Sequence, residues 1–139
     1  MNDFVVGDKI DLGEIILSEQ DIIDFAKVFD PLDFHTDKKA AEKTIFKGLI
    51  ASGPHPFNLI YRREWLPRYG KTVICGMGVL NWKFIKAIYA GQKANVTLTI
   101  LSVKPDLNIG GTAVTWFFEF TSEKGEMVQL LEMEVMHKV

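Results

Sequence analysis

The spacing of apolar residues changes near Val73 and separates the chain into two parts. After Val73 the apolar positions recur every second residue, which is the period of a β-strand with one buried face. The clearest alternating positions are Ala94, Val96, Leu98 and Ile100 in one run and Thr112, Val114, Trp116, Phe118 and Phe120 in the next. Turn-forming residues at 105–111 and 123–125 separate the runs. The last three strands are therefore predicted to form an antiparallel meander.

Before Val73 the apolar residues recur at helical spacing. Ser18 followed three residues later by Asp21 is typical of a capping box, and the helix that it opens should end before Pro31. The longest helical pattern is predicted to run from Pro54 to Leu66, with Pro67 as its stop. One face of this helix is almost wholly apolar and carries Phe57, Ile60, Tyr61, Glu64 and Trp65.

The segment between the two helices is expected to hold one more helical turn. Thr36 or Asp37 can cap a short turn over residues 38–42, and residues 44–49 should form a loop. Helices followed by antiparallel strands indicate the α+β class, with one sheet packed on one helix. At 139 residues, of which 47 % are apolar, the chain is predicted to be a single domain, 1–139.

Charge and composition exclude several function classes. The formal net charge is −2, which gives no electrostatic signal for nucleic acid or an anionic membrane as a partner. The N-terminal residues lack the features of a secretion signal and no apolar stretch reaches membrane-spanning length, so we expect a cytoplasmic protein. Cys75 is the single cysteine, so a cysteine-built zinc site is excluded, and we interpret it as a small strand residue rather than a nucleophile.

Two neighbouring segments carry the candidate chemistry. Asp30 and His35 lie five residues apart on what should be a proline-stiffened loop, and the run Ile50-Ala51-Ser52-Gly53 follows. A carboxylate and an imidazole held together can share the proton transfers of adding water to a double bond or removing it. A glycine at a helix start can supply a backbone N–H that stabilises the resulting negative charge.

These segments resemble the MaoC-like dehydratases, a family that includes the (R)-specific enoyl-CoA hydratases. Family members commonly carry Asp-Pro-x-x-Phe-His-x-Asp followed by Phe-x-Gly-Leu-Ile-Ala-Ser-Gly-x-His, and both stretches occur here with the family's separation. Gly78, Leu80, Trp82 and Gly91 also match the family's strand pattern. The chain departs from the pattern at Asp33, Pro54 and Pro56. The resemblance implies the hotdog fold, in which a curved sheet wraps the long helix.

The resemblance also implies an activity and a set of site residues. Asp30 and His35 would jointly hold the water that adds to C3 of a trans-2-enoyl thioester and deliver a proton to C2, giving the (R)-3-hydroxyacyl thioester. Gly53 would donate its N–H to the thioester oxygen. The residues expected to contact substrate are Ser52, Phe34, Ile50 and Ala51, although for Ser52 we favour capping the helix over a contact with substrate. The substrate would be an acyl-CoA or acyl-carrier-protein thioester, without a cofactor or metal.

Other interpretations of these residues stay open at this point. Asp33, Asp37 and His55 are chemically suitable metal ligands, but we favour a hydrogen bond within the helix N-terminus for His55. Arg62, Arg63, Arg68 and Lys71 form a basic stretch suited either to phosphates or to the solvent-facing end of a helix.

Two other functions are compatible with the same fold. A non-catalytic acyl-thioester binding protein or a hotdog thioesterase would share the substrate class.

Because a single curved sheet leaves one edge uncovered, and because hotdog proteins pair their sheets, we expect a homodimer or a dimer of dimers.

Overall fold

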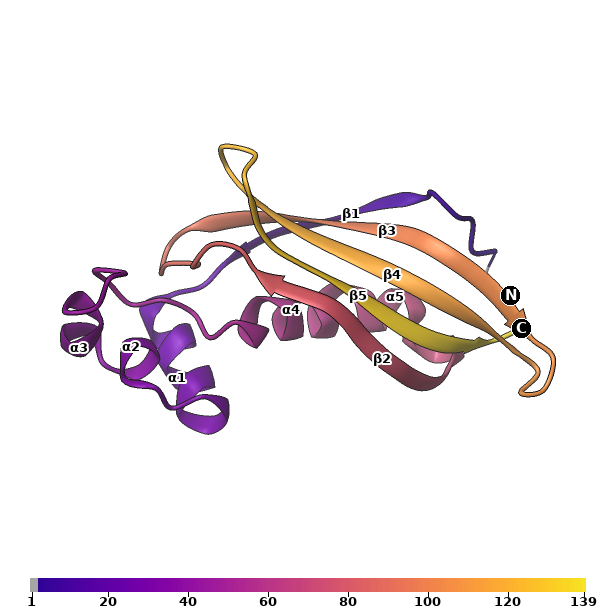
Figure 1. Cartoon of the computed structure of the whole chain (residues 1–139), viewed down its shortest axis with the longest axis horizontal. Coiled ribbons are helices and arrows are strands. Elements are labelled where there is room, and N and C mark those ends of the chain that lie inside the picture. The colour runs from indigo at the N-terminus through magenta and orange to yellow at the C-terminus, as the bar shows by residue number, and fades with distance from the viewer. Residues whose placement is uncertain (1–2) are drawn as a thin grey trace.

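The computed structural model describes residues 3–139, so the first two residues of the predicted domain lie outside it. Its centre is one five-stranded antiparallel sheet with the strand order β1-β3-β4-β5-β2. The strands are β1 (Lys9–Ile16), β2 (Val73–Phe84), β3 (Lys93–Asp106), β4 (Gly111–Ser122) and β5 (Met127–Lys138). The sheet curves along a long helix (Figure 1). The predicted α+β hotdog fold and its β3-β4-β5 meander are confirmed, whereas the sequence did not predict β1.

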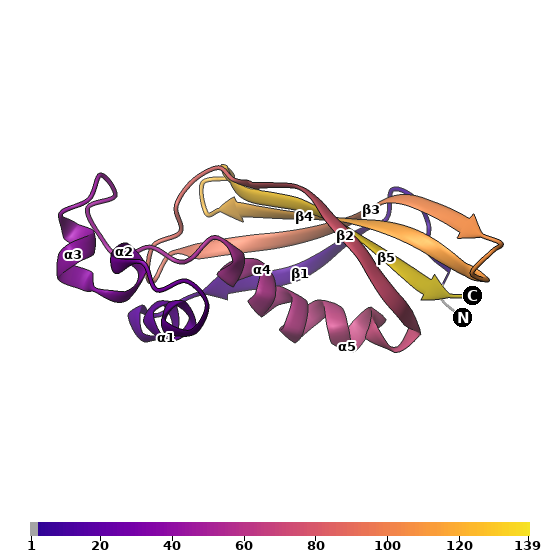
Figure 2. The same ribbon diagram turned by 60° about the horizontal axis from the view of Figure 1, so that its bottom comes forward.

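The long helix lies against one face of the sheet, as Figure 2 shows. It begins as α4 (Pro54–Ile60), passes through a π-helical turn (Tyr61–Trp65) and continues as α5 (Leu66–Tyr69) and a 3₁₀ turn (Gly70–Thr72). The prediction that Pro67 ends this helix is wrong. In the π-helical turn the Leu66 N–H donates to the Tyr61 carbonyl, and this wider ladder accommodates a residue without an N–H.

Arg68 compensates for the irregular ladder next to Pro67. Its Nη1 donates to the Glu64 carbonyl at 3.2 Å and to the Glu64 carboxylate at 2.6 Å. Glu64 also accepts from Arg63, and these guanidinium groups lower the pKa of the Glu64 carboxyl, Arg68 most strongly. Two of the four residues of the basic stretch are therefore engaged within the helix itself.

Aromatic residues fill the space between helix and sheet. Trp65 and Trp116 are fully buried and meet edge to face with ring centroids 5.6 Å apart, and Phe57 meets Phe118 in the same way at 5.1 Å. The alternation in β3 and β4 places every second residue in this core. Burial of large apolar side chains supplies most of the driving force for folding. The predicted apolar face of the helix is therefore the one that packs on the sheet.

Three short helices lie together beyond one end of the sheet (Figure 1). They are α1 (Glu19–Phe29), α2 (Asp33–Thr36) and α3 (Lys38–Glu42). The predicted capping box is present, since Ser18 and Asp21 exchange hydrogen bonds of 3.0 Å, and the predicted Asp37 cap of α3 is also confirmed. The predicted loop around His35 is wrong, because His35 lies in the single helical turn α2.

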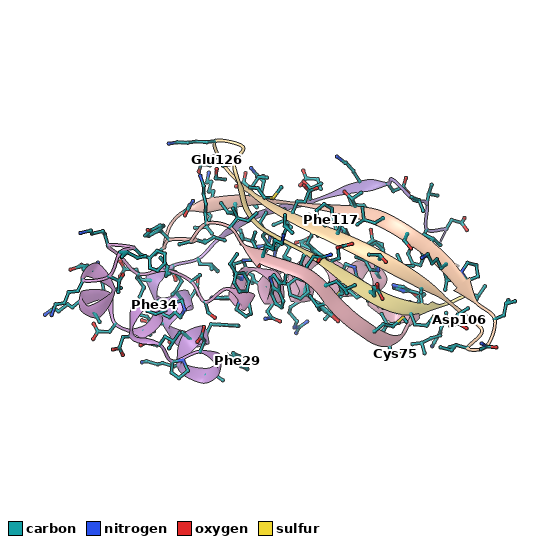
Figure 3. All side chains as sticks on the ribbon, in the orientation of Figure 1. Phe29, Phe34, Cys75, Asp106, Phe117 and Glu126 are labelled. Atoms are coloured by element: carbon teal, nitrogen blue, oxygen red, sulfur yellow. The ribbon has the colours of Figure 1, made fainter. Side chains whose placement is uncertain are left out.

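Strand β2 forms an edge of the sheet and is exposed along nearly all its length. Cys75 lies on this strand, as predicted, with its thiol exposed at the lower border of the molecule in Figure 3. Among residues 3–139, no helix is both long and apolar enough to cross a membrane.

Candidate active site

Asp30 and His35 come together where α1 ends and α2 begins. The backbone N–H of Asp30 donates to the Ala26 carbonyl at 2.8 Å, which fixes the aspartate at the C-terminus of α1. Its Oδ2 lies 3.4 Å from Nε2 of His35. The imidazole is buried, whereas a third of the Asp30 side chain is exposed. The pair therefore has one sheltered member and one member that solvent or substrate can reach.

The tautomer of His35 follows from its second ring nitrogen. Nδ1 lies 2.7 Å from the carbonyl oxygen of Ile50, which can only accept, so Nδ1 carries the proton and donates it. In the neutral ring Nε2 then presents its lone pair toward Asp30 and the adjoining pocket. Phe34 supports this orientation by packing edge-on against the imidazole at 4.4 Å. His35 is thereby arranged to accept a proton at one defined atom.

Ser52 orients the carboxylate. Its Oγ–H donates to Asp30 Oδ2 at 2.7 Å, and the residue is fully buried. The interpretation of Ser52 as a helix cap is wrong, because no side chain caps α4 and only the Ser52 carbonyl takes part there, accepting the His55 N–H at 3.0 Å. Among residues 3–139, no hydrogen bond reaches the other oxygen, Oδ1 of Asp30. That oxygen remains available to a water or a substrate.

Gly53 lies at the start of α4, beside the pair, and contacts the side chains of Gln129 and Phe84, which the sequence analysis did not single out. Trp82 Nε1–H donates to Gln129 Oε1 at 3.1 Å, and Gln129 Nε2–H donates to the Gly53 carbonyl at 3.0 Å. The Phe84 ring lies so close that a Cβ on Gly53 would be 2.5 Å from it. A glycine is therefore required here in the observed arrangement. The one available sequence signal was Gln129 itself, a polar residue within an otherwise apolar stretch of β5.

A pocket of about 350 Å³ brings these groups to one surface. Its wall includes Asp30, His35, Ile50, Ala51, Ser52 and Gly53, which are six of the seven predicted site residues. Phe34, the seventh, is not among the described residues that line this pocket and lies behind the imidazole. A second hollow of about 370 Å³ shares Asp30, Ser52 and Pro54 with the first and is completed by Phe25, Phe29 and Asn58. The carboxylate thus stands between two openings.

The sequence profile described as MaoC like domain matches residues 3–114. The chain belongs to this family. The chain is similar to the uncharacterized protein YdeM of Bacillus subtilis (strain 168). The two are 29 % identical over 110 residues, which cover 78 % of this chain and 77 % of that protein. The similarity thus extends over most of both chains.

Solved structures agree with the MaoC-like assignment. The MaoC-like dehydratase from Rhodospirillum rubrum is 28 % identical, with a TM-score of 0.84 over 97 % of this chain and 93 % of that chain. The (R)-hydratase PhaJ1 from Pseudomonas aeruginosa shares the fold at 24 % identity, with a TM-score of 0.78 over 97 % of this chain and 83 % of that chain. Family membership supports a hydratase or dehydratase activity in general terms.

His55 does not take the role expected of it in this MaoC-like chain. Its ring stacks on Phe25 with centroids 4.1 Å apart, and its buried Nδ1 has no hydrogen-bond partner among the described residues. Burial lowers the pKa of His55, and the charge of Asp21 opposes that effect. The expected hydrogen bond from the His55 side chain within the helix N-terminus is therefore absent from the part of the chain described, although the His55 backbone N–H donates to Ser52. Within that part, no three acidic, histidine or cysteine side chains cluster as metal ligands would.

Proposed function

We propose that the chain catalyses the reversible addition of water to a trans-2-enoyl thioester, giving the (R)-3-hydroxyacyl thioester. The observation that carries this proposal is the pair Asp30 and His35, with an oriented carboxylate and an imidazole of fixed tautomer on one pocket wall. Family membership supports the same class of reaction.

The arrangement suggests how the pair handles one water. Oδ1 of the Asp30 carboxylate and Nε2 of the neutral His35 ring are both acceptors, so a water between them donates both its hydrogens and turns a lone pair toward C3. The oxygen bonds to C3 while the pair removes one proton, and the π electrons of the double bond shift toward the thioester. The pair then returns a proton to C2, which balances the addition of H and OH.

Attack at C3 places negative charge on the thioester oxygen, and Gly53 is the proposed donor. Its N–H stands at the start of the long helix, where the partial positive charge of the helix dipole adds to a hydrogen bond. The hydrogen bond from Gln129 to its carbonyl holds the backbone in place. Ile50 and Ala51 would form the pocket wall against the substrate.

The substrate class is proposed to be an acyl-CoA or acyl-carrier-protein thioester. We propose a homodimer or a dimer of dimers, because β2 leaves an exposed apolar edge on the sheet.

One crotonyl-CoA assay tests the proposal against the two alternatives. Loss of enoyl absorbance without thiol release is the expected result. Thiol release would identify a thioesterase, and binding without either change would identify a non-catalytic acyl-thioester binding protein.

Substitution of the pair supplies the residue-level test. Asp30→Asn and His35→Gln should each lower kcat by at least ~100-fold, the lower end of what general acid–base catalysis provides. The double variant should be little worse than either single one, because the two groups act on the same water. Asp33→Asn, an exposed carboxylate on the same short helix, is the matched control and should retain full activity. Full activity in both single variants, with their folds intact, would refute the hydratase assignment.

A further inference from the structure

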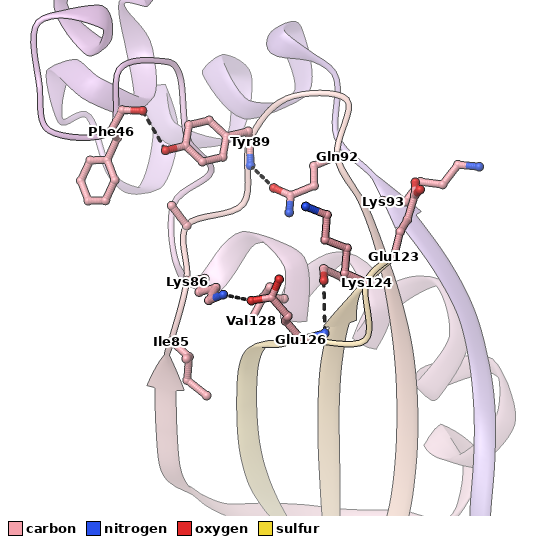
Figure 4. A pocket seen from close by; sticks show the side chains of 12 residues that line it. Phe46, Ile85, Lys86, Tyr89, Gln92, Lys93, Glu123, Lys124, Glu126 and Val128 are labelled. Carbon is pink, nitrogen blue, oxygen red and sulfur yellow. Dashed lines mark hydrogen bonds and ion pairs between the residues drawn. The ribbon is translucent and has the colours of Figure 1, made fainter.

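A third pocket, separate from the two beside Asp30, opens at the end of the sheet (Figure 4). Its volume is about 580 Å³. It lies between the segment that follows β2 and the turn that joins β4 to β5, and three lysines and two glutamates line it: Lys86, Lys93, Lys124, Glu123 and Glu126. None of these residues has a role in the chemistry proposed above.

This lysine pocket adjoins the pocket of the catalytic pair. The two share Phe46, Ile85, Lys86 and Ala87 as walls. The shared segment is held firmly, since the N–H groups of Ile85 and Lys86 both donate to the Val128 carbonyl, at 2.9 and 3.0 Å. A ligand whose reactive end lies beside Asp30 can therefore extend along this shared wall toward the lysines.

Two lysines have the position needed to meet an anion in this pocket. Lys86 extends from one wall and pairs with Glu126, both being about half exposed. Lys124 extends from the opposite turn, and Figure 4 shows its ammonium group pointing across the pocket toward Gln92. Ammonium groups are strong partners for phosphate, and a more highly charged phosphate can compete with the single charge of Glu126 for Lys86.

We propose that the lysine pocket binds the phosphate of the pantetheine arm that carries the acyl group. The inference rests on the proposed function, since that function requires a thioester substrate. Coenzyme A and holo acyl carrier protein share this phosphorylated arm. The shared wall from Ile85 to Ala87 guides the arm, Lys86 and Lys124 contact the phosphate, and Glu126 weakens the contact by holding Lys86.

Direct binding provides a test that does not depend on activity. Calorimetric titration with free CoA and with pantetheine, which lacks every phosphate, should show CoA binding more tightly to the parent protein. Lys86→Gln and Lys124→Gln should each weaken CoA binding about threefold, and together about tenfold, as expected for exposed charge pairs. Pantetheine binding should not change. Glu126→Gln should strengthen CoA binding, because it releases Lys86.

Kinetics test the same site in the working enzyme. The double lysine variant should raise KM for crotonyl-CoA about tenfold at unchanged kcat, and leave KM for crotonyl-pantetheine as in the parent. Crotonyl-phosphopantetheine separates the two sources of phosphate. If the double lysine variant raises KM equally for crotonyl-phosphopantetheine and crotonyl-CoA, the lysines bind the phosphate common to both carriers. If it raises KM for crotonyl-CoA alone, the lysines bind the nucleotide phosphates of CoA. Lys104→Gln, which removes an exposed charge from β3, is the control.

The outcomes separate failure of this proposal from failure of the proposed function. CoA binding and KM that are unchanged in the double lysine variant would overturn the lysine site, as would equal losses for CoA and pantetheine. A parent protein that hydrates neither thioester, yet binds CoA through these lysines, would instead refute the hydratase and retain the phosphate site.

Discussion

At the scale of single residues, the sequence predicted the pair Asp30 and His35 but not the contacts that orient it. The spacing of Asp30 and His35 pointed to a shared task, and the structure places their side chains 3.4 Å apart. The hydroxyl of Ser52 and the carbonyl of Ile50 then fix each partner, and these contacts span 22 and 15 residues. Periodicity describes only near neighbours, so contacts at such separations could not be derived from it.

Ser52 is expected to act as a positioning residue through Asp30. Ser52→Ala removes the hydrogen bond to Oδ2 and lets the carboxylate rotate, so kcat should fall about tenfold. KM should stay near the parental value, since the serine hydroxyl is engaged with Asp30 and not with substrate. Steady-state kinetics on crotonyl-CoA measures kcat and KM separately. A rise in KM at constant kcat would instead support direct substrate binding by Ser52, as the sequence resemblance implied.

The effect of replacing Gly53 can be resolved into two causes. Gly53→Ala keeps the backbone N–H, but its methyl would stand where the thioester must approach and would perturb this donor. Activity should therefore fall by about two orders of magnitude, as it does when other enzymes lose one oxyanion donor. The added methyl would also meet the Phe84 ring at 2.5 Å, but this ring is 55 % exposed and can turn outward, so the fold should persist.

The double variant Gly53→Ala with Phe84→Ala separates crowding of the ring from perturbation of the donor. We expect it to remain as inactive as the single glycine variant, while Phe84→Ala alone retains activity. Recovery in the double variant would show that displacement of the ring, and not the N–H of Gly53, limits the reaction.

At the scale of elements, the sequence predicted a helix or strand correctly where a single local rule determined it. The prediction failed where a second structural feature opposed that rule. The capping box of α1 and the alternation in β3 and β4 were predicted because each follows from nearest-neighbour geometry. Pro67 misled the prediction because its missing N–H is tolerated within a helix that widens by a π-helical turn. Strand β1 gave no clear alternation because a bulge between Asp11 and Gly13 shifts its register.

The exposed edge strand β2 is expected to mediate dimerisation. Its apolar side chains, with that of the next residue, are about half exposed: Ile74, Met77, Val79, Leu80, Phe84 and Ile85. Leu80→Lys should convert the dimer into a monomer, because a lysine on an edge strand opposes pairing with another sheet. The substitution should leave the fold intact, since Leu80 lies opposite Glu132 and a lysine there gains an ion-pair partner.

Light scattering at micromolar concentration measures this change in mass. Val28→Lys is the matched control, because Val28 is even more exposed but lies on α1, away from the edge. A parent protein that is already monomeric, or a Leu80→Lys variant that stays dimeric, would show that β2 is not the interface.

At the scale of the whole molecule, several parts of the fold meet at His137, which lies far from the candidate site. Trp116 Nε1–H donates to His137 Nε2 at 3.2 Å, so the ring proton lies on Nδ1, which donates to Thr72 Oγ1 at 2.9 Å. The rings of Phe4, Trp65 and Trp116 surround the imidazole within 6 Å. The N-terminal segment, the end of the long helix and two strands therefore meet at one fully buried histidine.

This histidine should make the stability of the protein depend on pH. Burial lowers the pKa of His137 from 6.5 to about 4, because the charged ring would lose its hydration. The unfolded chain binds this proton below pH 6.5 and the folded chain only near pH 4, so stability is lost as the pH falls through that window. The loss amounts to about 3 kcal/mol. His137→Gln cannot titrate, and urea unfolding should show it less stable than the parent at pH 7, with the gap closing as the pH approaches 4. All other ionisable groups are the same in both proteins and cancel in the difference, so a gap that is constant from pH 7 to pH 4 would disprove a neutral buried His137.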